Sequence, residues 1–406
     1  MDSGDTAWIL MSTALVLFMT PGLAFFYGGM VRSKNVLGML MQNFSAMGLL
    51  AIIWAVVSFS LAFDNFGDEG LLGGLGHLGL KDVGIEPALG LTIPFILFAA
   101  YQMTFAVITP ALITGATADR MKYSAYMLFI GIWAIVVYAP VAHWAFGGGW
   151  MAAMGALDFA GGAVVHINAG AAALAVILVL GRRQGWPDDT MHPHSLPLTL
   201  LGTGILWFGW FGFNAGSALA ANGVAAQALI NTFLAASAAM LAWLLVEKLK
   251  TGHATTLGGA SGAVAGLVAI TPCAGFVGAM PSIIIGAVAG ALCLLAIQLK
   301  FRFRYDDSLD VIGVHLVGGL VGSILLGLFA DSTVNSVVSN DGLLLGGGSA
   351  LLVDQLVSSG AVLAFSFVAS FIIAKAIDVV IGLRVTPEQE EEGLDRSLHA
   401  EAGYTL

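Results

Sequence analysis

The sequence predicts an all-α integral membrane protein with eleven transmembrane helices, ten of them forming two inverted halves. Three observations lead to this fold class. First, 58% of the 406 residues are hydrophobic and only 10% are charged, whereas a soluble domain carries about 25% charged residues. Second, most apolar runs are long enough to cross a bilayer as helices and too long for the ~10-residue strands of a barrel. Third, basic residues fall in every second connection.

Charged or turn-rich breaks divide the chain into eleven apolar stretches. The first follows the acidic start MDSGDTAWIL and is too long for a signal-peptide core, so it is expected to be the first mature helix. The stretches are rich in Ala and in Gly, and such small residues let helices approach closely in lipid. The predicted helices are 6–31, 36–63, 90–117, 122–146, 158–181, 196–218, 223–249, 256–271, 276–299, 309–330 and 346–382.

The basic residues predict the orientation. By the positive-inside rule, the connections that carry them are cytoplasmic, so the N-terminus lies outside and the C-terminus inside. The alternate connections contain only Lys81, and the acidic, Gly-rich segment 64–89 is expected outside. The cytoplasmic basic residues are Arg32, Lys34, Arg120, Lys122, Arg182, Arg183, Lys248, Lys250, Lys300, Arg302 and Arg304.

Helices one to five and six to ten then run in opposite senses through the membrane. An odd number of helices per half gives an inverted repeat, in which sites form near the midplane between the halves. The predicted transmembrane domain is 1–382, with halves at about 1–181 and 194–330 and a long last helix at 346–382. Residues 383–406 form an acidic, polar cytoplasmic tail.

Two histidines lie within long apolar stretches in similar contexts, LDFAGGAVVHINAG (157–170) and LDVIGVHLVGG (309–319). A titratable ring in hydrocarbon costs several kcal/mol unless it faces a cavity or a partner. At about 1.5 Å per residue, His166 lies about 12 Å beyond Asp158, and His315 lies about 8 Å beyond Asp310. Both rings are therefore expected near the middle of the membrane, approached from opposite sides.

Two neutral imidazoles can share one proton, because each ring donates from one nitrogen and accepts on the other. His166 and His315 are therefore predicted to form a hydrogen-bonded pair that lines a narrow pore. The alternative is two unrelated histidines that bond to backbone carbonyls. A metal site is not expected, because no third Cys, His or carboxylate accompanies the pair inside the bundle. Cys273 and Cys293 do not indicate a disulfide framework.

Asp158 and Asp310 stand at the starts of their helices, where an aspartate caps free N–H groups and complements the helix dipole. Capping alone explains both residues. Asp158 is also expected to lie near the outer mouth, where its charge adds to a field that attracts cations.

Aromatic residues cluster near the mouths, at Phe105, at Phe146 and in LWFGWFGFNAGS (206–217). Most aromatic residues in membrane helices belong to the core or to the interfacial belt. A cation is nevertheless attracted to ring faces, so rings beside the Ser217 hydroxyl form a sensible first binding site for a small cation.

These segments closely resemble the ammonium transporter (Amt/Mep/Rh) family, on its Amt branch. The resemblance covers essentially the whole chain and includes PGLAFFYGGMVRSKNVLGM (21–39), YQMTFAVITPALI (101–113), GALDFAGGAVVHINAG (155–170), GWFGFNAGSALAAN (209–222), SGAVAGLVAITPCAGFV (261–277), LDVIGVHLVGG (309–319) and the tail GLRVTPEQEEEGLDRSLHAEAGY (382–404).

The resemblance implies a homotrimer of eleven-helix subunits, each with its own narrow, mostly hydrophobic pore. His166 and His315 match the family's twin histidines, and Phe105 and Phe213 match a stacked gate above them. In the same way, Ser217 and Asp158 match the outer recruitment site and the acid below it, and Trp210 matches a pore-lining tryptophan. The family has Trp where this chain has Phe146, a weaker cation–π partner.

The resemblance implies a transporter of ammonium and methylammonium in the cell membrane, not an enzyme, with no cofactor and no nucleic-acid partner. Ammonium would lose its proton, cross as ammonia and send the proton along the histidines. The alternative is an ammonium sensor that signals through a fused or partner module with little flux. An acidic tail is usually solvated and flexible, but the resemblance favours a tail docked on the cytoplasmic face, where a PII signalling protein binds many family members.

Overall fold

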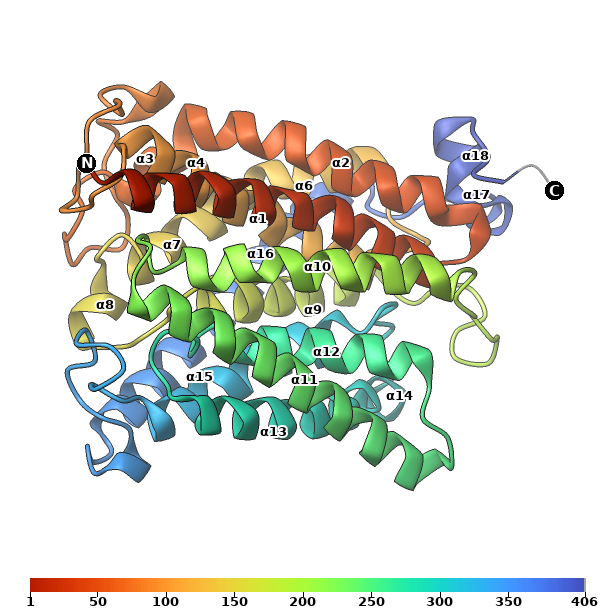
Figure 1. Ribbon diagram of the computed structural model, residues 1–406. Helices are drawn as coiled ribbons and strands as arrows, with labels where there is room; N and C mark the ends of the chain where they lie inside the picture. The colour runs from red at the N-terminus through yellow and green to blue at the C-terminus, as the bar shows by residue number, and fades with distance from the viewer. Residues whose placement is uncertain (405–406) are drawn as a thin grey trace.

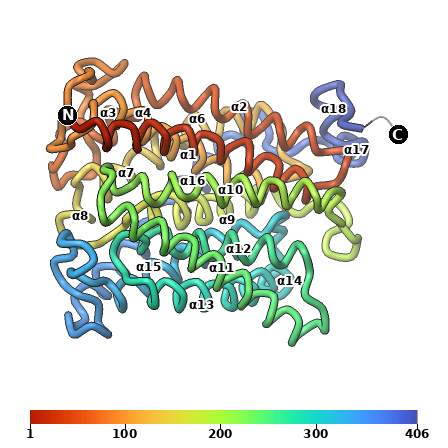
Figure 2. Tube along the Cα trace, in the orientation of Figure 1, coloured from red at the N-terminus to blue at the C-terminus, as the bar shows by residue number. Residues whose placement is uncertain are grey.

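The computed structural model of the chain describes residues 1–404, and the last two residues of the predicted tail lie outside this range. Residues 1–404 form helices and connecting loops, with no named strand. The long helices run roughly side by side from one end of the molecule to the other (Figure 1). The N-terminus and the C-terminal segment lie at opposite ends of this bundle (Figure 2).

Ten helical segments of the described chain are long and apolar enough to cross a membrane. They match ten of the predicted stretches and thereby confirm an all-helical membrane fold. The eighth predicted stretch forms α12 (Thr256–Ile270), a shorter apolar helix of 15 residues. The ten segments are Ser3–Met30, Ser33–Phe63, Phe95–Thr117, Tyr123–Met154, Gly162–Leu180, Leu196–Gly216, Gly223–Thr251, Ala279–Phe303, Ile312–Phe329 and Ala350–Ile381.

Several segments combine consecutive helical pieces. The individual helices are α1 (Ser3–Met30), α2 (Val36–Ile53), α3 (Phe59–Phe63), α4 (Phe95–Leu112), α5 (Thr114–Thr117), α6 (Tyr123–Trp133), α7 (Ala139–Ala145), α8 (Trp150–Met154), α9 (Asn168–Leu180), α10 (Leu196–Gly216), α11 (Gly223–Thr251), α13 (Ala279–Ile297), α14 (Leu299–Phe303), α15 (Val317–Phe329), α16 (Ala350–Ile381), α17 (Pro387–Glu392) and α18 (Leu394–His399).

Four short π-helical segments interrupt the regular helices. They are η2 (Trp54–Ser58), η4 (Ala134–Tyr138), η5 (Gly162–Ile167) and η6 (Ile312–Leu316). Such wide turns are rare and occur frequently at functional sites. Here η5 contains His166 and η6 contains His315, so both histidines lie on locally widened helix.

Small residues let α1 and α10 pack antiparallel at close range. A Cβ atom at Gly202 would come within 2.2 Å of the Phe26 backbone nitrogen, and one at Gly22 within 2.6 Å of Ile205. Side chains at either position would therefore force the two helices apart. This contact agrees with the tight packing that the Gly-rich composition predicts.

The tail is helical and docked, as the family resemblance implies and unlike a solvated acidic run. Its α17 and α18 lie beside the start of α2 (Figure 1). Asp395 accepts hydrogen bonds from the backbone N–H groups of Leu37 (3.0 Å) and Gly38 (2.8 Å). Glu390 is buried, pairs with Arg384 inside the tail at 2.6 Å and accepts a hydrogen bond from the backbone N–H of Gln184 at 2.7 Å. These bonds hold the tail on the end of the bundle opposite the N-terminus.

Candidate functional site

The segment that carries His166 begins with a carboxylate cap. Asp158 accepts four backbone hydrogen bonds at 2.6–3.1 Å, from the N–H groups of residues 161–164. Gly161 has a φ of 120°, a conformation that side chains rarely adopt, and it turns the chain into η5. The helix therefore begins at Gly162 and not at residue 158, and the predicted capping role of Asp158 is confirmed.

The segment that carries His315 has the same cap, but at a different aspartate from the predicted one. Asp307 accepts hydrogen bonds from the N–H groups of Val311 (3.1 Å) and Ile312 (2.7 Å). Asp310 instead has a φ of 64° and pairs with Lys300 Nζ at 2.6 Å. The prediction that Asp310 caps this helix is therefore wrong, because its backbone occupies the turn position and its side chain points to a lysine.

With this correction the two segments share one register. Each capping aspartate, Asp158 or Asp307, precedes its histidine by eight residues. Each segment also has a left-handed residue five positions before the histidine, Gly161 in one and Asp310 in the other. The sequence pattern Leu-Asp suggests a different alignment, and the hydrogen bonds and backbone conformation show which positions correspond.

His166 and His315 face one another directly. Their Nδ1 atoms lie 3.2 Å apart, and the rings are stacked with centroids 5.3 Å apart. The two residues are only 1% and 3% exposed. Because the contact joins Nδ1 to Nδ1, one neutral ring donates and the other accepts. The predicted hydrogen-bonded pair is present, and the alternative of backbone-satisfied histidines is not what the structure shows.

Two aromatic rings of α10 pack against His166 and against each other. Phe213 stacks on His166 with centroids 6.1 Å apart, and Trp210 stacks on the same imidazole at 5.5 Å. Trp210 Nε1 donates to Thr271 Oγ1 at 2.9 Å, which fixes the indole. Together these rings border a cavity of only about 10 Å³, lined by Met19, Leu23, Phe26, Ile108, Leu112, Val165, His166, Leu206, Trp210, Phe213, Val264 and His315.

A much larger cavity, of about 220 Å³, lies on the other side of Phe105. Phe105 borders this outer cavity and Phe213 borders the narrow one, and their ring centroids are 4.4 Å apart. The two rings therefore separate the cavities. The outer cavity is lined by Phe66, Leu89, Leu91, Phe98, Gln102, Phe105, Ala145, Phe146, Phe159, Ser217 and Leu219.

The structure brings most of the predicted site residues together around these two cavities. Phe146 and Ser217 line the outer one, beside Phe105. The Ser217 hydroxyl donates to the carbonyl of Phe213 at 2.8 Å, so its oxygen can still accept a hydrogen bond from a ligand. Asp158 does not line the cavity, because both of its oxygens are occupied by the cap of η5.

The comparisons with known proteins identify the family of the chain. Residues 7–404 match the model of the Ammonium Transporter Family. The chain belongs to the ammonium transporter family. An ammonium transporter of Mycobacterium tuberculosis is 51% identical over 99% of this chain and 90% of its own length. The crystal structure of Mep2 from Candida albicans superposes with a TM-score of 0.89 at 38% identity, covering 96% of this chain and 88% of that one.

A solved structure called Sensor Amt Protein is also similar, with a TM-score of 0.90 at 28% identity over 97% of this chain and 98% of that one. Membership in the ammonium transporter family makes this chain a multi-pass protein of the cell membrane, in a family of transporters and not enzymes. No group of three or more His, Cys, Asp or Glu residues that could hold a metal ion occurs within residues 1–404.

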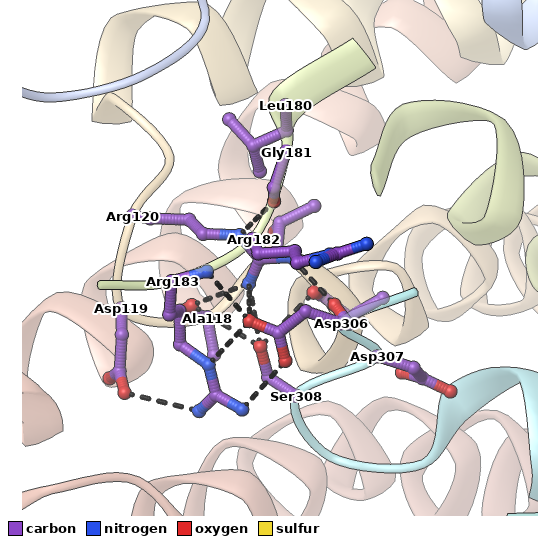
Figure 3. Close-up of polar contacts among 12 residues, drawn as sticks. Ala118, Asp119, Arg120, Leu180, Gly181, Arg182, Arg183, Asp306, Asp307 and Ser308 are labelled. Carbon is purple, nitrogen blue, oxygen red and sulfur yellow. Dashed lines mark hydrogen bonds and ion pairs between the residues drawn. The ribbon is translucent and has the colours of Figure 1, made fainter. Parts of the chain in front are cut away.

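The end of the bundle that carries the tail contains a charged network that the sequence reasoning missed (Figure 3). Arg183 Nη2 pairs with Asp306 at 2.8 Å, and its Nη1 lies 3.4 Å from Asp119. Arg120 donates to the carbonyls of Gly181 (2.9 Å) and Asp306 (2.7 Å). Burial opposes ionisation of Asp306, but bonds from Arg183 lower its pKa below the ordinary value. The network joins three loops, of which the one that carries Asp306 comes directly before η6.

Proposed function

We propose that this ammonium transporter recruits ammonium in the outer cavity and conducts ammonia and a proton separately past His166 and His315. The contact between the two Nδ1 atoms carries the proposal. It joins two imidazoles that border a narrow cavity with a mostly apolar lining, and the tilted ring pair of Phe105 and Phe213 closes this cavity off from the outer one. Burying two titratable rings is costly, and their mutual hydrogen bond supports a shared role for them.

Recruitment requires a site that favours a cation over water without trapping it. The rings of Phe105 and Phe146 offer negative faces, and the Ser217 oxygen offers one acceptor. Asp158 contributes through its field and not by contact, because its oxygens bind the backbone of η5. A cation in the outer cavity is partly dehydrated before it meets the rings of Phe105 and Phe213.

The narrow cavity excludes an intact ion, because dehydrating a charge in an apolar environment costs many kcal/mol. A potassium ion faces that cost and cannot shed a proton, whereas ammonium can. Ammonia then passes Phe105 and Phe213 as a neutral molecule. This difference accounts for selectivity for ammonium over potassium without a separate site that distinguishes the two ions.

The histidine pair then carries the proton. The ring that donates through Nδ1–H leaves its Nε2 free to accept, and the ring that accepts on Nδ1 carries its proton on Nε2. Protonation at the outer nitrogen, transfer between the two Nδ1 atoms and release from the far ring move one positive charge inward. Tautomer exchange restores the original state for the next cycle.

The proposed topology has eleven transmembrane helices in inverted halves, with the N-terminus outside and the tail inside. The shared register of Asp158 and Asp307 before their histidines supports the repeat. Arg120 and Arg183 lie beside the docked tail, and this agrees with a cytoplasmic basic end. The proposed domain division keeps 1–382 as the transmembrane unit, with residues 383–404 docked beneath it.

The proposed assembly is a homotrimer with one pore in each subunit, as the family resemblance implies. The docked tail offers a PII signalling protein a rigid surface instead of a flexible one. Its α17 and α18 are held by buried bonds through Glu390 and Asp395.

Electrophysiology on solid-supported membranes tests the transport proposal. An ammonium jump applied to proteoliposomes should evoke a current with the wild-type protein and none with His166→Ala/His315→Ala. His253→Ala, on an exposed loop, is the matched control and should keep the full current. Unchanged currents in the double variant would remove the histidines from the proton path.

The second candidate is an ammonium sensor. Two observations support the sensor function as a second candidate. Phe146 lines the proposed recruitment site, and the chain is similar to the structure called Sensor Amt Protein. Calorimetric titration of the same preparation distinguishes the two functions. Ammonium binding without any current supports a sensor, whereas binding and a saturable current together support a transporter.

A further inference from the structure

The outer cavity is much larger than the ion that it is proposed to recruit. Its volume is about 220 Å³, whereas about 10–15 Å³ is enough to hold one water molecule. Ammonium is about the size of water, so a single ion leaves most of the cavity unfilled. Drug-sized pockets begin near about 300 Å³, so the cavity suits a compact ligand of several heavy atoms.

The wall of this cavity recognises cations without depending on their hydrogen atoms. Five phenyl side chains line it, whereas only Gln102 and Ser217 contribute polar side chains and no carboxylate does. Attraction to ring faces needs no N–H group and strengthens where water is excluded. The five rings are those of Phe66, Phe98, Phe105, Phe146 and Phe159.

Phe146 increases the space for a bulky cation. A phenyl ring occupies less of the cavity than an indole ring would at this position. It attracts a small ion weakly, because such an ion cannot contact every wall at once. A larger cation contacts several rings at once and also buries its own apolar surface, which adds a favourable contribution that ammonium lacks.

The route inward is closed to such a ligand. Phe105 and Phe213 lie with centroids 4.4 Å apart, and the cavity beyond them holds only about 10 Å³. A cation with four carbon substituents has no proton to lose, so it cannot pass as a neutral molecule. The outer cavity therefore selects by charge and the narrow cavity by size and acidity.

We propose that the outer cavity is a binding site for small quaternary ammonium ions of the tetramethylammonium class, which occupy it without being transported. Binding follows from the cavity itself, and block of ammonium uptake rests on the proposed transport function. The Ser217 hydroxyl distinguishes ammonium from a quaternary ammonium ion. Ammonium donates a hydrogen bond to its oxygen, whereas a quaternary ion cannot.

The first experiment titrates purified protein with tetramethylammonium chloride in a calorimeter, with sodium chloride as the blank. The wild type should bind saturably. Phe146→Leu should weaken tetramethylammonium binding by about five- to thirty-fold, the range expected for loss of a cation–π contact. Phe303→Leu, an exposed ring on α14 outside the cavity, is the matched control and should bind normally. Absence of wild-type binding would overturn the inference.

The second experiment adds tetramethylammonium to the ammonium-jump current measurement. The half-saturating ammonium concentration should rise in proportion to the blocker while the maximal current stays constant. Ser217→Ala should weaken ammonium recruitment several-fold but change the inhibition constant of the blocker by less than about two-fold. A lowered maximal current, equal weakening of both ligands, or a current carried by tetramethylammonium would each contradict the proposal.

The outcomes also keep the two proposals apart. Ammonium currents that tetramethylammonium does not affect would leave the transport function standing and remove the new site. Saturable, Phe146-dependent binding to a protein that gives no ammonium current would retain the site and remove transport.

Discussion

Asp307 is a buried carboxyl whose ionisation should change the stability of the protein with pH. The residue is 2% exposed and accepts hydrogen bonds from Val311 and Ile312. Burial, reinforced by the negative charge of Asp310, raises the pKa of Asp307 from 3.8 to about 7, although Lys300 partly offsets this. The substitution Asp307→Asn keeps the shape of the protonated acid and removes its titration.

The direction of the effect follows from where the proton is bound. Between about pH 4 and about pH 7 the unfolded chain has released the Asp307 proton, whereas the folded protein keeps it. The free energy of unfolding of the wild type therefore falls as the pH rises through this window, by about 1.4 kcal/mol per pH unit. Asp307→Asn lacks this contribution, so its stability relative to wild type rises with pH and levels off above about pH 7.

Unfolding by sodium dodecyl sulfate in mixed micelles, followed by tryptophan fluorescence from about pH 4.5 to about pH 8, measures this difference. Asp310→Asn is the companion variant. It removes a charge that raises the pKa of Asp307, so the pH window should end at a lower pH. Parallel wild-type and Asp307→Asn curves across the whole range would refute the reasoning.

Two further predictions concern packing and the tail. Gly170→Ala places a Cβ within 2.5–2.7 Å of η6 and should cost about 1–3 kcal/mol, measured by detergent unfolding. Gly204→Ala, with nothing within 4 Å, should be neutral or stabilising, and equal effects at both positions would contradict the prediction. Glu390→Gln removes the charge that binds both Arg384 and the backbone N–H of Gln184 and should loosen the tail by about 1.5–3 kcal/mol, seen as faster tryptic cleavage. Exposed Glu392→Gln is its control, and an unchanged cleavage rate in Glu390→Gln would remove the pair as an anchor.

The sequence is enough to predict the long helices and the histidine pair, because both depend on local and chemical signals. The length of an apolar stretch identifies a membrane-spanning helix, and a buried imidazole requires a hydrogen-bond partner. The structure adds which atoms of the two rings meet and which type of helix carries them. His166 and His315 meet through Nδ1 on two π-helical segments, and the apolar pattern contains no signal for such widened turns.

The cap of η6 shows why a local motif can mislead. Asp158 and Asp310 both follow Leu, so similarity of neighbours pairs them. Backbone geometry pairs Asp158 with Asp307, because the cap must precede the turn residue that opens the helix. Equal spacing of eight residues before each histidine was available in the sequence and is the signal that could have found Asp307.

The buried charges at the tail end could not be recognised from spacing at all. Asp119, Arg183 and Asp306 come from three connections far apart in the chain. From the sequence alone, such residues are interpreted as solvated loop charges that indicate the orientation of the chain. The fold brings the three loops together and buries the charges, and their burial is tolerated because they are paired.

The two capping aspartates explain how a helix can begin close to the narrow cavity that the proposed function treats as a pore. Each π-helical segment starts with unpaired N–H groups whose partial positive charge would oppose a protonated histidine nearby. Asp158 and Asp307 accept hydrogen bonds from those groups and so satisfy them. In the proposed relay, a proton can then rest briefly on His166 or His315 beside helix starts whose N–H groups are already bound. Removing either cap should therefore hinder proton passage as well as loosen the helix, even though neither carboxylate touches an imidazole.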